Sequence, residues 1–410
     1  MSNQVSNAGP QPRIVLYATV VAGLGGFGIT ISMANILGND YANFAAFWAV
    51  YFVVLGALGG IQQETARATS SSTLSPSSRP FKHVYLMGLL IAFVTLATMS
   101  FTYFFANQIL QVSPLEQSLA LIFGTALSVP SLIAGGALFG LKLWKPLSVF
   151  IILDVVVRWV LLLVVSVFTH DLAWLSWMVA VPSIITFALL LPIIRSTVGF
   201  DIALDSTFQQ AAKNMFYTTV AALGASVLIN GVPAVLVAKA DKEDLALTAG
   251  LVFALIMSRA PLVVGSMALQ SLYVVRFRDC PEARGRRAIV LGLAGLGVSL
   301  VLALASWIFG LPLLEAISGL EMRFSAEYLA GLTLTSVFTM WVVISGSICL
   351  AASNHAFYAL GWFVAAAVTI SILLIPAASE IKLLVALTAG PLAGVSTHLV
   401  GHIRRAKENS

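Results

Sequence analysis

Long apolar runs separated by short polar segments dominate the chain. A helix of ~20 apolar residues crosses the ~30 Å hydrocarbon core of a bilayer and satisfies its own backbone hydrogen bonds there. Such runs cover residues 14–36, 42–61, 84–106, 115–141, 147–168, 174–194, 215–238, 245–275, 288–311, 328–350, 356–376 and 383–401. The pattern therefore predicts an all-α polytopic membrane protein with twelve transmembrane helices.

The composition leaves little room for anything outside the membrane. Of the 410 residues, 59% are hydrophobic and 10% are charged. The longest polar stretches, 62–81, 196–210 and 276–287, are too short to build a core of their own. The net charge of +5 fits basic anchors at a membrane surface, so no nucleic-acid partner is expected. The sequence shows no cysteine or histidine spacing typical of a metal site, no cofactor motif in a fitting context and no catalytic cluster.

The loop charges predict the orientation. With the N-terminus inside, sixteen Lys and Arg residues fall on the inner side, and the outer loops hold only Lys239, Lys242, Arg323 and Lys382. Cytoplasmic loops carry an excess of basic residues. We therefore expect a multi-pass protein of the bacterial plasma membrane with both termini cytoplasmic.

The chain divides into two similar halves. Tyr17-Ala18-Thr19-Val20-Val21-Ala22 aligns with Tyr217-Thr218-Thr219-Val220-Ala221-Ala222, two hundred positions later. Six helices per copy give both copies the same orientation, related by an axis along the membrane normal. We expect an N-terminal lobe (1–195), a cytoplasmic linker (196–210) and a C-terminal lobe (211–410), related by a pseudo-two-fold axis.

Arg259 is the most informative polar residue, because it lies near the middle of the eighth run. A guanidinium at this depth costs at least ~2.5 kcal/mol, so it should face a cavity or a partner. Either it contacts substrate, or it pairs with an acidic helix face. Asp154 and Arg158, one turn apart in the fifth run, form either a structural ion pair or an ion-coupling site. If they neutralise each other, Arg259 has no evident mid-membrane carboxylate and suits an anionic ligand such as phosphate.

Other polar residues gather at the inner ends of the second and eighth runs. Gln62, Glu64 and Arg67 follow the second run, and Gln270 ends the eighth. They are either interfacial caps or the lining of a polar inner vestibule with a gate. Asn230 is expected to make an interhelical hydrogen bond.

Prolines and glycines mark possible bends. Gly231 and Pro233 make the seventh helix a hinge candidate. Pro261 makes the eighth helix a second hinge candidate, near Arg259. The segment Gly23-Leu24-Gly25-Gly26-Phe27-Gly28 matches a dinucleotide-binding pattern, but it lies inside an apolar span without the required strand, so close helix packing is expected instead.

The layout and several short motifs resemble a known superfamily. Gln62-Gln63-Glu64-Thr65-Ala66-Arg67, Ser258-Arg259-Ala260-Pro261-Leu262 with Gln270, and Gly140-Leu141-Lys142-Leu143-Trp144-Lys145-Pro146 resemble polysaccharide-type flippases. These belong to the superfamily of multidrug, oligosaccharidyl-lipid and polysaccharide exporters. Lipid II flippases carry further arginines in the first helix, which this chain lacks beyond Arg13.

The resemblance implies a transporter, not an enzyme, that moves a polyisoprenyl-diphosphate-linked oligosaccharide to the outer leaflet by alternating access. It places Arg259 at the diphosphate. The partners it implies are membrane lipids and, as further candidates, glycan polymerases or glycosyltransferases. A proton- or sodium-coupled drug antiporter, with Asp154 as its carboxylate, is the alternative. A membrane-embedded transferase is disfavoured because no acidic or histidine cluster faces the membrane surface.

Overall fold

The computed structural model describes residues 11–72, 82–197, 208–240, 245–279, 282–376 and 380–408, and within them every regular element is helical. The elements are α1 (Gln11–Leu37), η1 (Gly38–Asp40), α2 (Tyr41–Ser72), α3 (Lys82–Ile109), α4 (Pro114–Gly140), α5 (Trp144–Phe168), α6 (Leu172–Ala180), α7 (Pro182–Thr197), α8 (Phe208–Asn230), α9 (Val232–Lys239), α10 (Leu245–Asp279), α11 (Arg284–Ala305), η3 (Ser306–Gly310), α12 (Leu311–Ser318), α13 (Ala326–Ala351), α14 (His355–Leu374) and α15 (Glu380–Glu408).

These helices form twelve membrane crossings. In the described part of the chain, eleven stretches are long and apolar enough to span a bilayer, and the first of them contains both α1 and α2. The helices α6 and α7 form one crossing, as do α8 and α9. The predicted twelve-helix class is confirmed. Residues 198–207 of the predicted linker lie outside the described residues.

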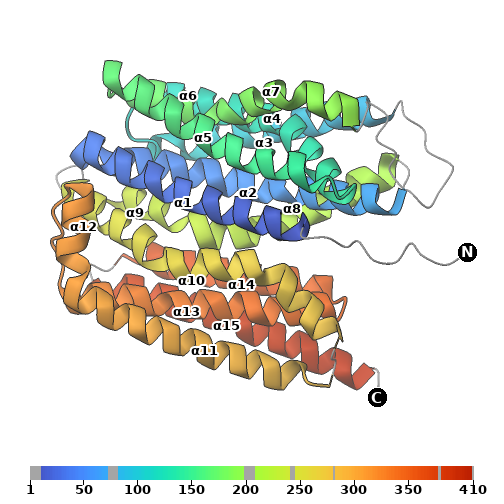
Figure 1. Ribbon diagram of the computed structural model, residues 1–410. Helices are drawn as coiled ribbons and strands as arrows, with labels where there is room; N and C mark the ends of the chain where they lie inside the picture. The colour runs from blue at the N-terminus through green and yellow to red at the C-terminus, as the bar shows by residue number, and fades with distance from the viewer. Residues whose placement is uncertain are drawn as a thin grey trace, which may run out of the picture.

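The start of α1 and the end of α15 lie at one end of the bundle, called the terminal end below; the other is the distal end (Figure 1). The basic clusters around Lys142, Lys213, Arg276 and Arg284 lie at the terminal end, because each flanks a helix end that points there. The charge asymmetry read from the sequence therefore coincides with one physical end of the bundle.

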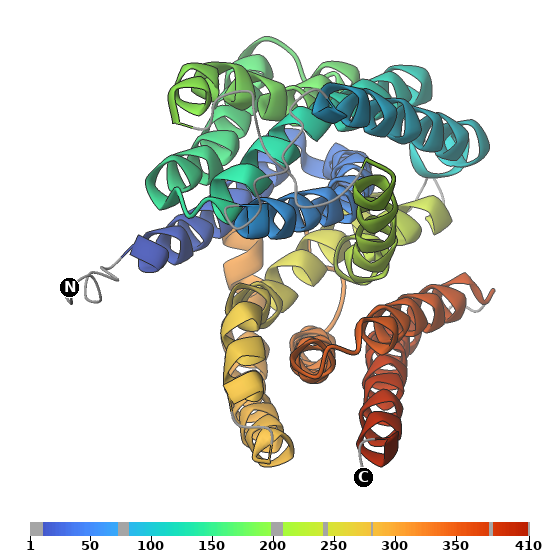
Figure 2. The same cartoon turned by 90° about the vertical axis from the view of Figure 1, so that its right-hand side faces the viewer.

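The two lobes repeat one packing scheme. In the first six crossings, α1 packs on α5, α4 packs on α2, α3 and α6–α7, and α5 packs on α6–α7. In the second six, α8 packs on α14, α13 packs on α10, α11 and α15, and α14 packs on α15. These are the same pairs of positions, which is what a pseudo-two-fold repeat requires. Figure 2 looks onto the terminal end, with the N-terminal lobe above the C-terminal one.

Two helix breaks follow from local sequence, and one crossing extends further than the sequence suggested. Val181 separates α6 from α7 immediately before Pro182, and Gly231 separates α8 from α9 two residues before Pro233. Proline cannot donate its backbone hydrogen bond, so helices break or bend at such places. The ninth run does not end at residue 311 as the apolar pattern suggested. It continues through the π turn η3 into α12 and ends at Ser318, followed by Gly319 with φ +66°.

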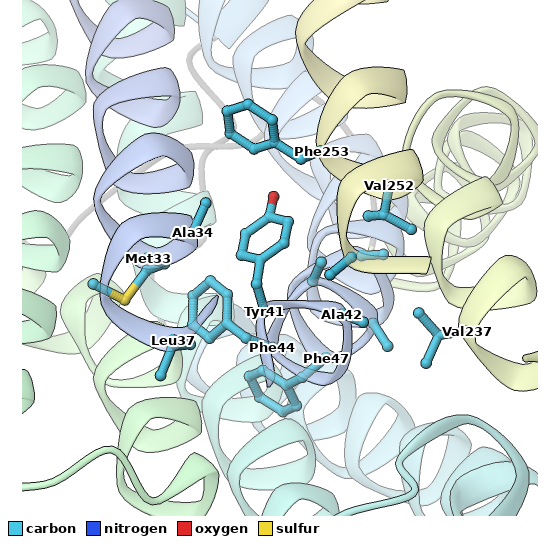
Figure 3. Close-up of a cluster of buried hydrophobic side chains, with 14 of the residues drawn as sticks. Met33, Ala34, Leu37, Tyr41, Ala42, Phe44, Phe47, Val237, Val252 and Phe253 are labelled. Carbon is cyan, nitrogen blue, oxygen red and sulfur yellow. The ribbon is translucent and has the colours of Figure 1, made fainter. Parts of the chain in front are cut away.

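A buried cluster joins the two lobes at the distal end. This cluster, the distal seal, consists of Leu37, Tyr41, Ala42, Val237, Val252 and Phe253, all at most 8% exposed (Figure 3). The rings of Tyr41 and Phe253 meet edge to face with centroids 5.9 Å apart. Gln111 donates to the carbonyl of Val237 at 3.0 Å. Apolar contact and polar bonds together close this end.

The lobes also touch along a seam between α2 and α8. Thr218 donates to the carbonyl of Gly60 at 2.8 Å, and Ser226 donates to that of Phe52 at 3.1 Å. A Cβ added to Gly60 would meet the backbone of Thr218 and Thr219. Glycine at this position therefore sets how closely the two helices approach.

Replacing Gly60 with alanine should destabilise the protein by about 1–3 kcal/mol, because the added methyl forces α2 and α8 apart. Gly59 is the matched control, since a Cβ there meets nothing within 4 Å. Thermal melts of the purified variants should show a fall in apparent Tm for Gly60→Ala and no fall for Gly59→Ala. Equal melting curves would contradict the described seam.

Candidate functional site

A cavity of about 310 Å³ lies between the lobes, lined by α1, α2, α8, α9 and α10. Its polar lining residues are Thr30, Asn230 and Arg259, and the rings of Phe27, Trp48 and Phe52 form much of the remaining wall. The distal seal lies beyond it, since Phe253 precedes the lining residues of α10 along that helix and Tyr41 precedes those of α2. The cavity is therefore closed off from the distal end.

Of the described residues in the lining, Arg259 alone is charged, and it is 6% exposed. Its Nη2 donates to Thr339 Oγ1 on α13 at 3.1 Å, and its Nε has no hydrogen-bond partner. Among the described residues, no carboxylate forms an ion pair with it. The acidic-face alternative raised by the sequence has no counterpart in this arrangement. A buried guanidinium with open donor capacity is suited to an anion.

The helix around Arg259 is continuous although it contains Pro261. Proline at this position leaves the carbonyl of Met257 without its usual intrahelical donor. Met257 does not line the cavity, so this carbonyl is not part of the site. The hinge role of Pro261 and of Gly231 and Pro233 stays a prediction.

Asp154 and Arg158 are paired inside the N-terminal lobe. Arg158 Nη2 contacts Asp154 Oδ2 at 2.7 Å, and Nη1 donates to the carbonyl of Val179 at 3.0 Å. Val179 lies beside the break between α6 and α7, so the guanidinium satisfies a carbonyl at that break. Ser183 Oγ donates to Asp154 Oδ1 at 3.1 Å.

An aromatic ring separates this pair from the cavity. Phe52 lines the cavity, and its centroid lies 5.2 Å from Cζ of Arg158. Arg158 is 1% exposed, and neither it nor Asp154 belongs to the lining. The geometry is that of a structural ion pair that holds the fifth and sixth crossings together.

The glutamate and arginine of the second run also meet each other. Glu64 is 4% exposed and forms a bidentate contact with Arg67, at 2.7 and 2.9 Å. Asn214 of α8 donates to Glu64 Oε1 at 2.8 Å, which extends the α2–α8 seam to the terminal end. Glu64 therefore links the two lobes.

The two glutamines turn away from the cavity. Gln62 points toward α4, where its amide nitrogen would lie 3.0 Å from a Cβ on Gly135. Gln270 donates to the hydroxyl of Tyr358 on α14 at 3.3 Å. Neither they nor Glu64 and Arg67 line the cavity around Arg259, and the proposed vestibule role of the four stays a prediction.

Sequence reasoning missed several residues of the site. Thr339, which holds the guanidinium, gave no signal because hydroxyls are frequent throughout its helix. Asn230 was expected to make an interhelical hydrogen bond; the bond described is to Ser226 one turn earlier on the same helix, at 3.4 Å, and Asn230 also lines the cavity. The aromatic wall could not be separated from lipid-facing rings. Gly28 of α1 packs against Trp159, as expected for close helix packing. Gly26 of the same helix lines the cavity instead.

Comparison with known proteins places the fold. No family model matches the chain. A protein of Mycobacterium tuberculosis strain H37Rv described as "Uncharacterized protein Rv3630" is 27% identical, with 97% of this chain and 93% of that protein covered. A second from the same strain, "Uncharacterized protein Rv1510", is 25% identical, with 89% and 85% covered.

Solved structures extend the comparison. The lipid II flippase MurJ in an inward closed conformation matches with a TM-score of 0.70 at 14% identity, covering 94% of this chain and 86% of that one. An outward-facing multidrug resistance MATE family transporter of the MOP superfamily matches with 0.66 at 12%, covering 98% of each. The chain therefore has the twelve-helix, two-lobe fold of MOP-superfamily transporters, and it is a many-span membrane protein.

Proposed function

We propose that this protein is a flippase that exports a polyisoprenyl-diphosphate-linked oligosaccharide from the inner to the outer leaflet by alternating access, for cell-surface polysaccharide assembly. The observation that carries the proposal is Arg259, a buried guanidinium in a cavity between two lobes, with no carboxylate partner among the described residues. A diphosphate supplies the missing charge and accepts paired hydrogen bonds from guanidinium. The terminal end is cytoplasmic in this proposal.

The surroundings suit the rest of such a substrate. The aromatic wall of Phe27, Trp48 and Phe52 offers apolar faces for sugar rings. Toward the terminal end, apolar side chains of α1 and α10 are exposed, including Tyr17, Leu24 and Leu272. An isoprenoid chain would lie along this surface while the headgroup occupies the cavity.

The rival function is a drug or cation antiporter on the same fold. Two of the structural neighbours are multidrug resistance MATE family transporters of the MOP superfamily. One neighbour, a MOP superfamily transporter from Pyrococcus furiosus, is described as having a binding pocket of reverse polarity that suggests a different function; it matches with a TM-score of 0.63 at 12% identity and covers 99% of this chain and 100% of that one. In this chain the charged lining residue is cationic, which disfavours a cationic drug.

Binding to the purified protein in nanodiscs tests the proposal. A polyprenyl diphosphate-linked saccharide should compete with a fluorescent polyprenyl diphosphate, and a polyprenyl alcohol should not. A cationic dye should bind weakly or not at all. Tight dye binding together with indifference to the diphosphate would replace the flippase proposal with the antiporter.

Thr339→Val should weaken binding of the diphosphate probe by about 3- to 10-fold, because the guanidinium loses the hydroxyl that fixes its orientation. Valine keeps the volume of threonine. The control is Thr335→Val on the same helix, whose hydroxyl bonds the carbonyl of Leu332 instead. Equal affinities in the two variants would show that Thr339 does not position Arg259.

A further inference from the structure

His398 is a buried titratable side chain in the C-terminal lobe that the proposed export step does not use. It lies on α15 where α13 and α14 pack against that helix, and it is 1% exposed. A Cβ on Gly361 would collide with its Nε2, and a Cβ on Gly346 would lie 3.1 Å from its Cε1. Two glycines on neighbouring helices thus make room for the imidazole.

The hydrogen bonds of the ring allow two protonation states. Nε2 lies 3.1 Å from the carbonyl oxygen of Tyr358, which can only accept, so Nε2 carries a proton. Nδ1 lies 2.8 Å from Ser345 Oγ, which in turn lies 3.2 Å from the carbonyl of Val342. If the hydroxyl donates to Nδ1, the ring is neutral. If it donates to Val342, Nδ1 can carry a second proton and donate to Ser345.

Rotation of one hydroxyl therefore converts a site for imidazole into a site for imidazolium, with both ring nitrogens bonded in each case. The titratable groups that contact His398 are Tyr358, whose ring stacks on it at 6.3 Å, and Cys349, whose thiol lies 3.6 Å from its carbonyl. On its own helix, His402 and Arg404 follow toward the terminal end. In the part of the chain that is described, no carboxylate bonds to it.

A protonated ring would thus sit in the lobe without a counter-charge. Burial of an uncompensated charge is unfavourable, so the packing described favours the neutral ring. Protonation then favours any conformation in which α14 and α15 loosen around the ring and admit water. The site links proton binding to helix packing.

Two short routes connect this ring to Arg259. Ser345 shares α13 with Thr339, which holds the guanidinium. Tyr358 accepts a hydrogen bond from Gln270, which lies on α10 with Arg259. A change in packing around His398 therefore reaches both helices that position Arg259. One of them, α10, also carries Val252 and Phe253 of the distal seal, so its displacement would loosen that seal.

We propose that His398 is a proton-binding site of this protein, and that a proton bound there shifts the molecule from the distally sealed conformation toward one with the distal seal open. The proposal rests on the proposed function only in requiring a transport cycle, and its test uses no substrate. Failure to bind a lipid-linked saccharide would therefore leave the test intact.

The experiment measures the distance between the distal ends of the lobes as a function of pH. Spin labels on His170→Cys and Ile381→Cys, both exposed distal positions, are read by double electron–electron resonance in nanodiscs, in a Cys280→Ser background with the buried Cys349 retained. The range runs from about pH 8 to pH 4, further into acid than an exposed imidazole needs, because the packing favours the neutral ring. Over this range, acid should move the distribution toward longer distances.

Three variants identify the titrating group. His398→Gln keeps an amide that can bond Tyr358 and Ser345 but does not titrate, so its distance distribution should not change with pH. His402→Gln, one turn further along the same helix, should titrate as the parent protein does. Ser345→Ala removes a hydrogen bond from both forms of the ring. The bond to the charged imidazolium is the stronger of the two, so the midpoint should move about one unit to lower pH.

The proposal is overturned if the parent protein shows no transition in this range, or if His398→Gln retains it. The distribution of His398→Gln at pH 8 must match that of the parent protein, which verifies its fold. If that variant does not fold, the midpoint of Ser345→Ala decides: an unchanged midpoint rejects His398 as the proton site.

Discussion

Arg259→Ala should lower the affinity for a polyprenyl diphosphate by about 30- to 150-fold, because a charged donor pair to phosphate contributes about 2–3 kcal/mol. Export of the lipid-linked saccharide in proteoliposomes should fall together with this affinity. Arg259→Lys should retain part of the affinity, since ammonium keeps the charge but not the paired geometry. Binding isotherms in nanodiscs provide the measurement.

Stability distinguishes a ligand contact from a structural residue. In the part of the chain that the structure describes, no carboxylate pairs with Arg259. Its removal therefore relieves a desolvated charge and should leave the apparent Tm unchanged or raised. Lys145→Ala, an exposed cation outside the cavity, controls for net charge and should bind normally. An Arg259→Ala variant that binds normally but melts early would show that the guanidinium supports the fold instead.

Asp154→Ala should destabilise the protein by about 3–5 kcal/mol, the cost of leaving a buried partner unpaired. The partner is Arg158, which is 1% exposed and would lose its 2.7 Å contact. Thermal melts of the purified protein should show a large fall in apparent Tm. This loss is one of stability, because Phe52 separates the pair from the cavity.

A double variant tests that explanation. Replacing Arg158 with methionine in the Asp154→Ala background removes the stranded charge and should recover much of the lost stability. Asp154→Asn should keep polyprenyl diphosphate binding near that of the parent protein. If Asp154→Asn instead abolishes transport while the protein melts normally, Asp154 couples an ion and the antiporter alternative gains support.

The sequence predicted the crossings and the one charged residue of the cavity, because both depend on length and polarity alone. An apolar run of membrane length has few structural options, and a guanidinium in such a run must avoid lipid. The break at Gly231 before Pro233 was also readable, since backbone chemistry decides it locally. The continuation of the ninth crossing to Ser318 was not, because Pro312 opposes a regular helix there and the chain accommodates it through the preceding π turn η3.

The sequence did not show which side of each helix faces lipid and which faces the protein core. Lipid-facing and core-facing positions are both apolar in a membrane, so periodicity does not separate them. Gln62 and Gln270 were predicted to line a vestibule from their position at the inner helix ends alone. The structure adds that each contacts its own lobe, which the sequence did not show. Thr339 holds Arg259 across eighty positions, and only the fold brings these residues together.

Electron cryomicroscopy of the full chain in nanodiscs with a polyprenyl diphosphate-linked saccharide tests the central claim most directly. We expect density for the diphosphate in the cavity between the lobes, within about 3 Å of the guanidinium nitrogens of Arg259. A headgroup bound elsewhere, with the guanidinium still bonded to Thr339 alone or paired with a carboxylate, would contradict the account.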